Sequence, residues 1–141
     1  MAILWPAFAL FLLTMLVVFR LARLRWGAVR SHQVDPRFYK IYRGEGEPEA
    51  VAVVSRHVSN LYEMPTLFYA GTAIAFAAGL SGTALVALGW TYVGLRLCHT
   101  LIHLGSNNVL WRFRVFAFSW LMLVAYWAFM GLQLAMRQAS A

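Results

Sequence analysis

Three polar residues lie close together at the start of a long, mainly apolar stretch of the sequence: Arg56, Asn60 and Glu63. Their spacing of four and then three residues places them on one face of a helix. Charge inside a lipid-embedded helix costs several kcal/mol, so such residues generally serve a purpose. Pro65 has no N–H, which leaves one helical carbonyl without a donor and predicts a bend. We expect a bent helix whose polar face lines a pocket.

A second polar group follows at Arg96, His99 and His103, spaced by three and then four residues. These side chains also share one helical face. Arg112 comes just after a turn-forming pair of asparagines, which returns the chain to the end where the first polar helix starts. We expect both groups to meet at that end, where their summed positive charge favours an anionic ligand.

Other interpretations of these residues stay open. Arg56 and Glu63 would also suit a purely structural buried ion pair. His99 and His103 have the i, i+4 spacing of a metal or haem site, for which only His57 offers a ligand on another helix. We expect no metal, although a small haem or quinone redox protein is kept as a further functional hypothesis.

The composition is that of a membrane protein. Of the 141 residues, 62% are hydrophobic and 12% are charged, and the apolar residues fall in long runs. The formal net charge is +7, but the basic residues lie mainly between these runs, as the positive-inside rule expects. We therefore expect no nucleic-acid binding, which requires an exposed basic groove. The one cysteine, Cys98, is expected to be a small buried residue.

The apolar runs predict four membrane-spanning helices within a single domain, residues 1–141, at about 2–20, 55–79, 83–105 and 113–136. The first run lacks the features of a signal peptide, so we expect it to be retained. A long basic loop is expected at about 21–54, with helical extensions at its ends. Backbone groups in a bilayer must pair internally, which favours an all-α four-helix bundle. The charged first and third loops are expected in the cytoplasm, with both termini on the opposite side.

Together the two polar groups resemble the MAPEG family, the membrane-associated proteins of eicosanoid and glutathione metabolism. The resemblance is carried by Arg56-x3-Asn60-x2-Glu63 with a following proline, and by Arg96-x2-His99-x3-His103 with Arg112 beyond it. It covers nearly the whole chain and implies a homotrimer of four-helix subunits. Where the family commonly has a tyrosine this chain has His103, which indicates a divergent, bacterial-type member in the bacterial inner membrane.

The resemblance also implies a function. It implies a glutathione-dependent transferase or peroxidase that acts on lipophilic electrophiles, with the alternative of a non-catalytic lipid- or partner-binding protein of the same fold. Arg112 would be the catalytic arginine that stabilises the thiolate. The residues that would bind glutathione, near the cytoplasmic side and between neighbouring subunits, are Arg56, Asn60, Glu63, Arg96, His99, His103 and, in a looser alignment, Arg23.

The chemistry of glutathione agrees with this set of side chains. Its two carboxylates suit bidentate arginines, and its ammonium group suits Glu63. A free thiol with a pKa of about 8.5 is mostly protonated at neutral pH. A guanidinium group within a few ångströms favours the thiolate, which can then attack an electrophile or peroxide arriving from the lipid.

Overall fold

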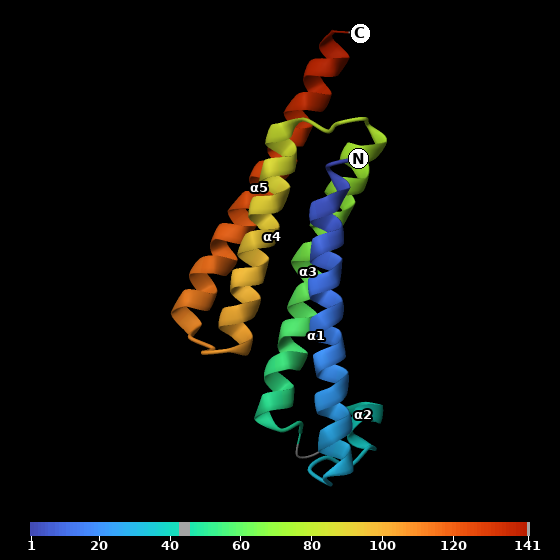
Figure 1. Ribbon diagram of the computed structural model, residues 1–141, viewed down its shortest axis with the longest axis vertical. Coiled ribbons are helices and arrows are strands. Elements are labelled where there is room, and N and C mark those ends of the chain that lie inside the picture. The colour runs from blue at the N-terminus through green and yellow to red at the C-terminus, as the bar shows by residue number, and fades with distance from the viewer. Residues whose placement is uncertain (43–45, 141) are drawn as a thin grey trace.

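The computed structural model describes residues 1–42 and 46–140, and there the chain is entirely helical apart from its connections. Four long helices lie side by side, and one short helix lies beside the lower end of the first (Figure 1). The helices are α1 (Leu4–Arg30), α2 (Phe38–Ile41), α3 (Glu49–Ala77), α4 (Thr83–Leu104) and α5 (Val109–Ala139). The predicted all-α helical bundle is confirmed.

Membrane insertion follows from the length and composition of these helices. In the described part of the chain, α1, α4 and α5 are each long and apolar enough to cross a bilayer. α3 has 29 residues and lies alongside them, but it is less apolar because it carries the first polar motif. The chain is an integral membrane protein, and a fourth crossing by α3 remains a prediction.

The segment predicted as a long loop at about 21–54 is largely helical at both ends. α1 continues to Arg30 and α3 begins at Glu49, so the connection spans 31–48, of which residues 43–45 lie outside the described part. The basic residues after the first apolar run end the lipid-facing sequence without ending the helix, since arginine is a good helix former. At the end of α1, His32 has a φ of 57° and the Gln33 N–H donates to Ala28 O at 2.9 Å.

The tight turn expected between the second and third spans is present. Gly79 has a φ of 68°, and the Leu80 N–H donates to Ala75 O at 2.8 Å, which closes the end of α3. Arg137 of α5 donates to Ala78 O at 2.7 Å and to Gly79 O at 3.2 Å. The carbonyls of the two residues that follow α3 are thus paired by a side chain from a different helix.

The apolar core joins the four long helices in the half of the bundle near the termini. The rings of Phe68, Tyr92 and Tyr126 are buried, with centroids 4.8 and 5.3 Å from Phe68 to the two tyrosines. A Cβ at Gly89 would lie 3.3 Å from the Pro6 Cγ atom, so this glycine allows α1 to approach α4. Cys98, expected to be buried, is exposed on α4.

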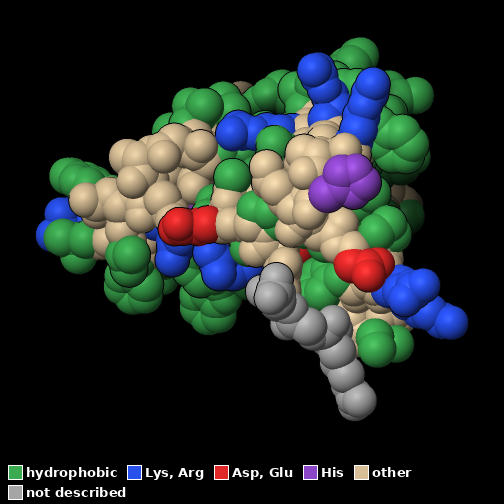
Figure 2. Space-filling model, turned by 90° about the horizontal axis from the view of Figure 1, so that it is seen from below, with side chains coloured by type: hydrophobic (Ala, Val, Ile, Leu, Met, Phe, Trp, Pro, Cys, Tyr) green, Lys and Arg blue, Asp and Glu red, His purple; other side chains and the backbone are tan. Residues whose placement is uncertain are grey.

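The two ends of the bundle differ in charge. Both termini and the α3–α4 turn lie at one end, and α2 and the α4–α5 turn lie toward the other (Figure 1). Seen from below, this second end carries many Lys and Arg side chains and fewer acidic ones (Figure 2). The two basic connections therefore share one end, as the positive-inside rule requires of loops on one side of a membrane.

Candidate functional site

A cavity of about 360 Å³ opens between α3, α4 and α5, and it gathers residues from both polar motifs. We call it the arginine–histidine pocket. It is lined by Arg56, Asn60, His99, His103, Val109, Arg112, Phe113 and Phe116. Five of these eight residues were predicted from the sequence as site residues. Since no carboxylate is among its lining residues, the pocket presents positive charge, neutral polar groups and aromatic surface.

The turn before α5 positions Arg112 at this pocket. Asn107 has a φ of 48°, and its Oδ1 atom accepts a hydrogen bond from Arg112 Nη1 at 2.7 Å. The next residue, Asn108, caps α5 by accepting from the Trp111 N–H at 3.1 Å. Asn107 therefore holds one edge of the half-buried guanidinium group, and the remaining N–H groups are available to an anion.

Arg114 has a different environment, although it lies only two residues further along. Its side chain is exposed, and its Cζ atom lies 5.1 Å from the centroid of the Trp111 ring. It is not among the residues that line the pocket. The two arginines of this segment thus separate into one that faces the pocket and one that faces outward.

Arg96 lies behind the pocket and joins α4 to α3. Its side chain is fully buried, and Nη2 donates to the Asn60 side-chain oxygen and, at 3.3 Å, to the Asn60 carbonyl. Its Nε and Nη1 atoms are buried without a hydrogen-bond partner among the described residues. Burying donors without partners is costly. The buried guanidinium group is a source of positive potential behind the pocket, and its hydrogen bonds hold the Asn60 side chain at the pocket wall.

Three histidine rings pack together beside the pocket. The ring centroids of His57 lie 4.8 Å from His103 and 5.5 Å from His99, and His99 and His103 are 5.7 Å apart. His57 is fully buried, and its Nε2 atom lies 2.9 Å from Thr100 Oγ1. Within the described residues, no three His, Cys, Asp or Glu side chains are arranged to hold a metal ion.

Two predicted site residues lie outside the pocket of a single chain. Glu63 is exposed on α3, and Arg23 is exposed on α1, where its Cζ atom lies 6.0 Å from the Phe19 ring centroid. The ion pair considered for Arg56 and Glu63 does not form. The described part of the chain contains a single ion pair, which joins Arg25 Nε to Glu47 Oε1 at 2.7 Å.

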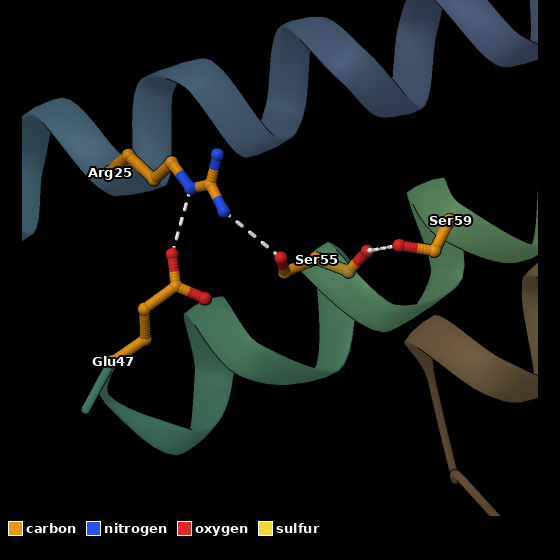
Figure 3. A network of polar contacts seen from close by, with 4 residues as sticks. All are labelled: Arg25, Glu47, Ser55 and Ser59. Atoms are coloured by element: carbon orange, nitrogen blue, oxygen red, sulfur yellow. Dashed lines mark hydrogen bonds and ion pairs between the residues drawn. The ribbon is translucent and has the colours of Figure 1, made fainter. Parts of the chain in front are cut away.

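That ion pair belongs to a separate network at the basic end (Figure 3). Besides binding Glu47, Arg25 donates from Nη2 to Ser55 Oγ at 3.0 Å and lies over the Tyr39 ring at 5.1 Å. Burial and the neighbouring Glu47 carboxylate raise the pKa of Tyr39. Arg25 thus connects α1, the connection before α3 and the residue that precedes Arg56.

Sequence reasoning missed Asn107 and Thr100 as residues that position the site. Thr100 lies four residues after Arg96, a spacing from which its hydroxyl can donate to the Arg96 carbonyl, as it does at 2.8 Å. Asn107 precedes a helix-capping asparagine, a pattern that indicates a turn but does not indicate which side chain the first asparagine holds.

Comparisons with known proteins give one clear result. No curated protein and no solved structure matches the chain. The model of the MAPEG family matches residues 3–132, which include both polar motifs, Arg112 and all four long helices except the end of α5. The match covers almost the entire sequence, and the chain therefore belongs to the MAPEG family.

Proposed function

We propose that this protein is a membrane-bound, glutathione-dependent transferase or peroxidase that acts on lipophilic electrophiles. Members of its family are typically glutathione-dependent enzymes. The observation that carries the proposal is the arginine–histidine pocket, where Arg56, Asn60, His99, His103 and Arg112 come together from three helices. We place this end of the molecule in the cytoplasm, where glutathione is abundant in its reduced form.

The charge of the pocket suits the ligand. Glutathione has two carboxylates, and arginine binds carboxylates through paired hydrogen bonds. Arg56 and Arg112 both line the pocket, and the buried Arg96 lies directly behind Asn60. With no carboxylate among the lining residues, nothing in the pocket competes for these guanidinium groups.

Arg112 is the residue we assign to catalysis. Its guanidinium is held by Asn107 on one side and is half-buried, so its charge is less screened than that of an exposed arginine. A thiolate formed beside it would be stabilised where negative charge develops, with no reorganisation of the protein. The lipophilic substrate would arrive laterally, since the pocket lies between helices whose outer faces are apolar.

The exposed positions of Glu63 and Arg23 support assembly into a homotrimer. A carboxylate on the outer face of a helix in a bilayer needs a polar partner, and Glu63 has none within the described part of its own chain. We propose that a neighbouring subunit covers this face. Glu63 would then take the ammonium group of glutathione, and Arg23 would contribute from the adjacent subunit.

The test is the ultraviolet absorbance of thiolate during titration of glutathione into detergent-purified protein at neutral pH. We expect a saturable thiolate signal in the wild type. Arg112→Ala should lose this signal and lower turnover by about 10²- to 10³-fold, the effect of removing one donor to a developing anion. Arg114→Ala, which removes an exposed arginine two residues away, serves as the matched control and should behave as the wild type.

Two results would contradict the proposal. Unchanged turnover in Arg112→Ala would remove the assigned role of Arg112. Absence of both a thiolate signal and calorimetric binding in the wild type would instead favour a non-catalytic protein of this fold, with the pocket binding another anion or a lipid headgroup.

A further inference from the structure

We propose that His103 accepts the proton of the glutathione thiol, and that the buried His57 fixes the His103 tautomer that makes this transfer favourable. The inference rests on the proposed glutathione-dependent function. It assigns a proton acceptor to a step that Arg112 alone does not complete, because a guanidinium group stabilises a thiolate but has no lone pair with which to take its proton.

The choice of acceptor follows from the residues that line the arginine–histidine pocket. Arginine is always protonated and the asparagine amide is not basic, so neither can take a proton. The other lining residues, Val109, Phe113 and Phe116, are apolar. His99 and His103 are therefore the two lining groups with a basic nitrogen.

The hydrogen bonds of Thr100 determine the tautomer of His57. The hydroxyl of Thr100 lies 2.8 Å from the Arg96 carbonyl oxygen, which can only accept, so its single hydrogen points there. Toward His57, 2.9 Å away, the same hydroxyl must act as acceptor. The Nε2 atom of His57 therefore carries the hydrogen, and the lone pair of the neutral ring is on Nδ1.

This leaves an unsatisfied acceptor inside the bundle. His57 Nδ1 and His103 Nδ1 are both buried without a hydrogen-bond partner in the described part of the chain. Their rings are 4.8 Å apart, the shortest separation in the histidine cluster. No hydrogen bond joins the two rings as they stand, and His99 Nδ1 is likewise buried without a partner in the described part of the chain. A small rotation of the His103 ring that brings an Nδ1–H group to His57 Nδ1 would satisfy both atoms at once. The second nitrogen of His103, Nε2, then presents a bare lone pair.

His99 is less suited to this role. Its ring is 5.5 Å from His57, and it also packs against Phe116, with centroids 5.9 Å apart. His57 has one lone pair to offer and can fix the tautomer of one neighbour. We assign that neighbour as His103 because its ring is the closer of the two.

Electrostatics couples the proton transfer to ligand binding. Arg56 and Arg112 line the pocket together with His103, and no carboxylate is among the lining residues. An imidazolium ion is therefore unfavourable in the empty pocket. It becomes favourable beside a thiolate, because the two form a neutral ion pair, as in Cys–His pairs of thiol enzymes.

The step balances without any further reactant. The S–H bond of glutathione breaks, and an N–H bond forms on His103. The thiolate then forms a C–S bond with an activated alkene, and the resulting carbanion takes the proton back from His103. The neutral imidazole is restored for the next turnover.

The experiment measures thiolate and released protons together in the full-length, detergent-purified protein. Glutathione is added in weak buffer at neutral pH with a pH indicator, and S-methylglutathione, which has no thiol proton, is the matched ligand. The wild type should form thiolate without releasing protons to solvent. In His103→Asn, turnover with an activated alkene should fall by about 10²-fold, and any thiolate formed should release one proton. His32→Asn, a change of an exposed histidine that does not line the pocket, should leave both readouts unchanged.

The role of His57 as a positioning residue has its own readout. Thr100→Val keeps the side-chain shape but removes the acceptor of the His57 N–H. We expect it to slow thiolate formation while the affinity for S-methylglutathione is kept, a separation that a purely structural defect would not give. Nitrogen NMR of the wild type should show the hydrogen of His103 on Nδ1.

Each contrary result has a distinct meaning. Failure of the wild type to bind either ligand would overturn the proposed function itself. Binding with thiolate formation and one released proton per site would overturn only the role of His103, as would a hydrogen on His103 Nε2 in the NMR spectrum. The wild-type measurements decide this even if a variant fails to fold.

Discussion

Single residues in this pocket have clear partners, and those partners explain why neighbouring residues of the same type have different roles. Arg112 is held by Asn107, whereas Arg114 lies over Trp111 outside the pocket. The polar residues of α3 and α4 were predictable from helical spacing, since polar side chains at one face of an apolar helix are conspicuous. Arg112 was predicted from its place after the asparagine turn and from the family resemblance. The hydrogen-bond partner of each residue was not predictable from the sequence, because it depends on the path of the backbone in the turn between α4 and α5.

The pair Asn107 and Asn108 allows a test at this scale. Asn107→Gly removes the acceptor of Arg112 Nη1 but keeps the positive φ of 48° without strain. We expect kcat/KM to fall by about tenfold or more, since a charge-assisted hydrogen bond contributes about 1.5–3 kcal/mol. Asn108→Ala removes the cap on Trp111 N instead and should cost about 1 kcal/mol of stability with little effect on turnover. Equal kinetic losses in both variants would contradict the assignment.

At the scale of elements, the helices were predicted well and their ends less well. Long apolar runs identify helices because a bilayer allows few alternatives. They do not show where a helix ends in water. The apolar run ends before Arg20, but α1 continues to Arg30. The network of Arg25 with Glu47 and Ser55 gives a reason for this extension, because those contacts require α1 to reach the start of α3.

Close packing of these elements depends on particular glycines, and α4 offers a matched pair. A Cβ at Gly89 would lie 3.3 Å from Pro6 Cγ and 3.5 Å from Phe68 Cζ, whereas a Cβ at Gly94 meets nothing within 4 Å. Gly89→Ala should therefore lower the free energy of unfolding in detergent by about 1–3 kcal/mol through overpacking. Gly94→Ala should be neutral or should stabilise by up to about 1 kcal/mol through helix propensity. Equal destabilisation by both would show that space at Gly89 is not limiting.

For the whole molecule, the charge asymmetry and the positions of the two polar motifs agree. The predicted meeting of the motifs at the basic end is what the pocket shows, since Arg56 and Asn60 of α3 lie with His99 and His103 of α4. The burial of His57 against Thr100 was not predictable, because it depends on how two helices rotate as they pack. Such rotation is set by the shapes of many side chains together.

The crossing of α3 is the largest question about the fold and can be decided by labelling. In a background with Cys98→Ser, a single cysteine is introduced by Gln33→Cys at the basic end or by Ser81→Cys in the α3–α4 turn, both exposed positions. With four crossings, a membrane-impermeant maleimide should react with Ser81→Cys in intact cells and with Gln33→Cys only after permeabilisation.

Each labelling pattern distinguishes a different arrangement. Reaction of both cysteines from one side would mean that α3 enters the bilayer without crossing it, because one position precedes this helix in the chain and the other follows it. The reverse pattern would place the basic end and its pocket outside the cell, away from the reducing cytoplasm and its glutathione. The predicted pattern requires α3 to carry Arg56, Asn60 and Glu63 through the membrane. The free-energy cost of charged side chains in the bilayer is offset only when a buried partner or a ligand pairs with them. The labelling experiment therefore tests the topology and the function of the pocket together.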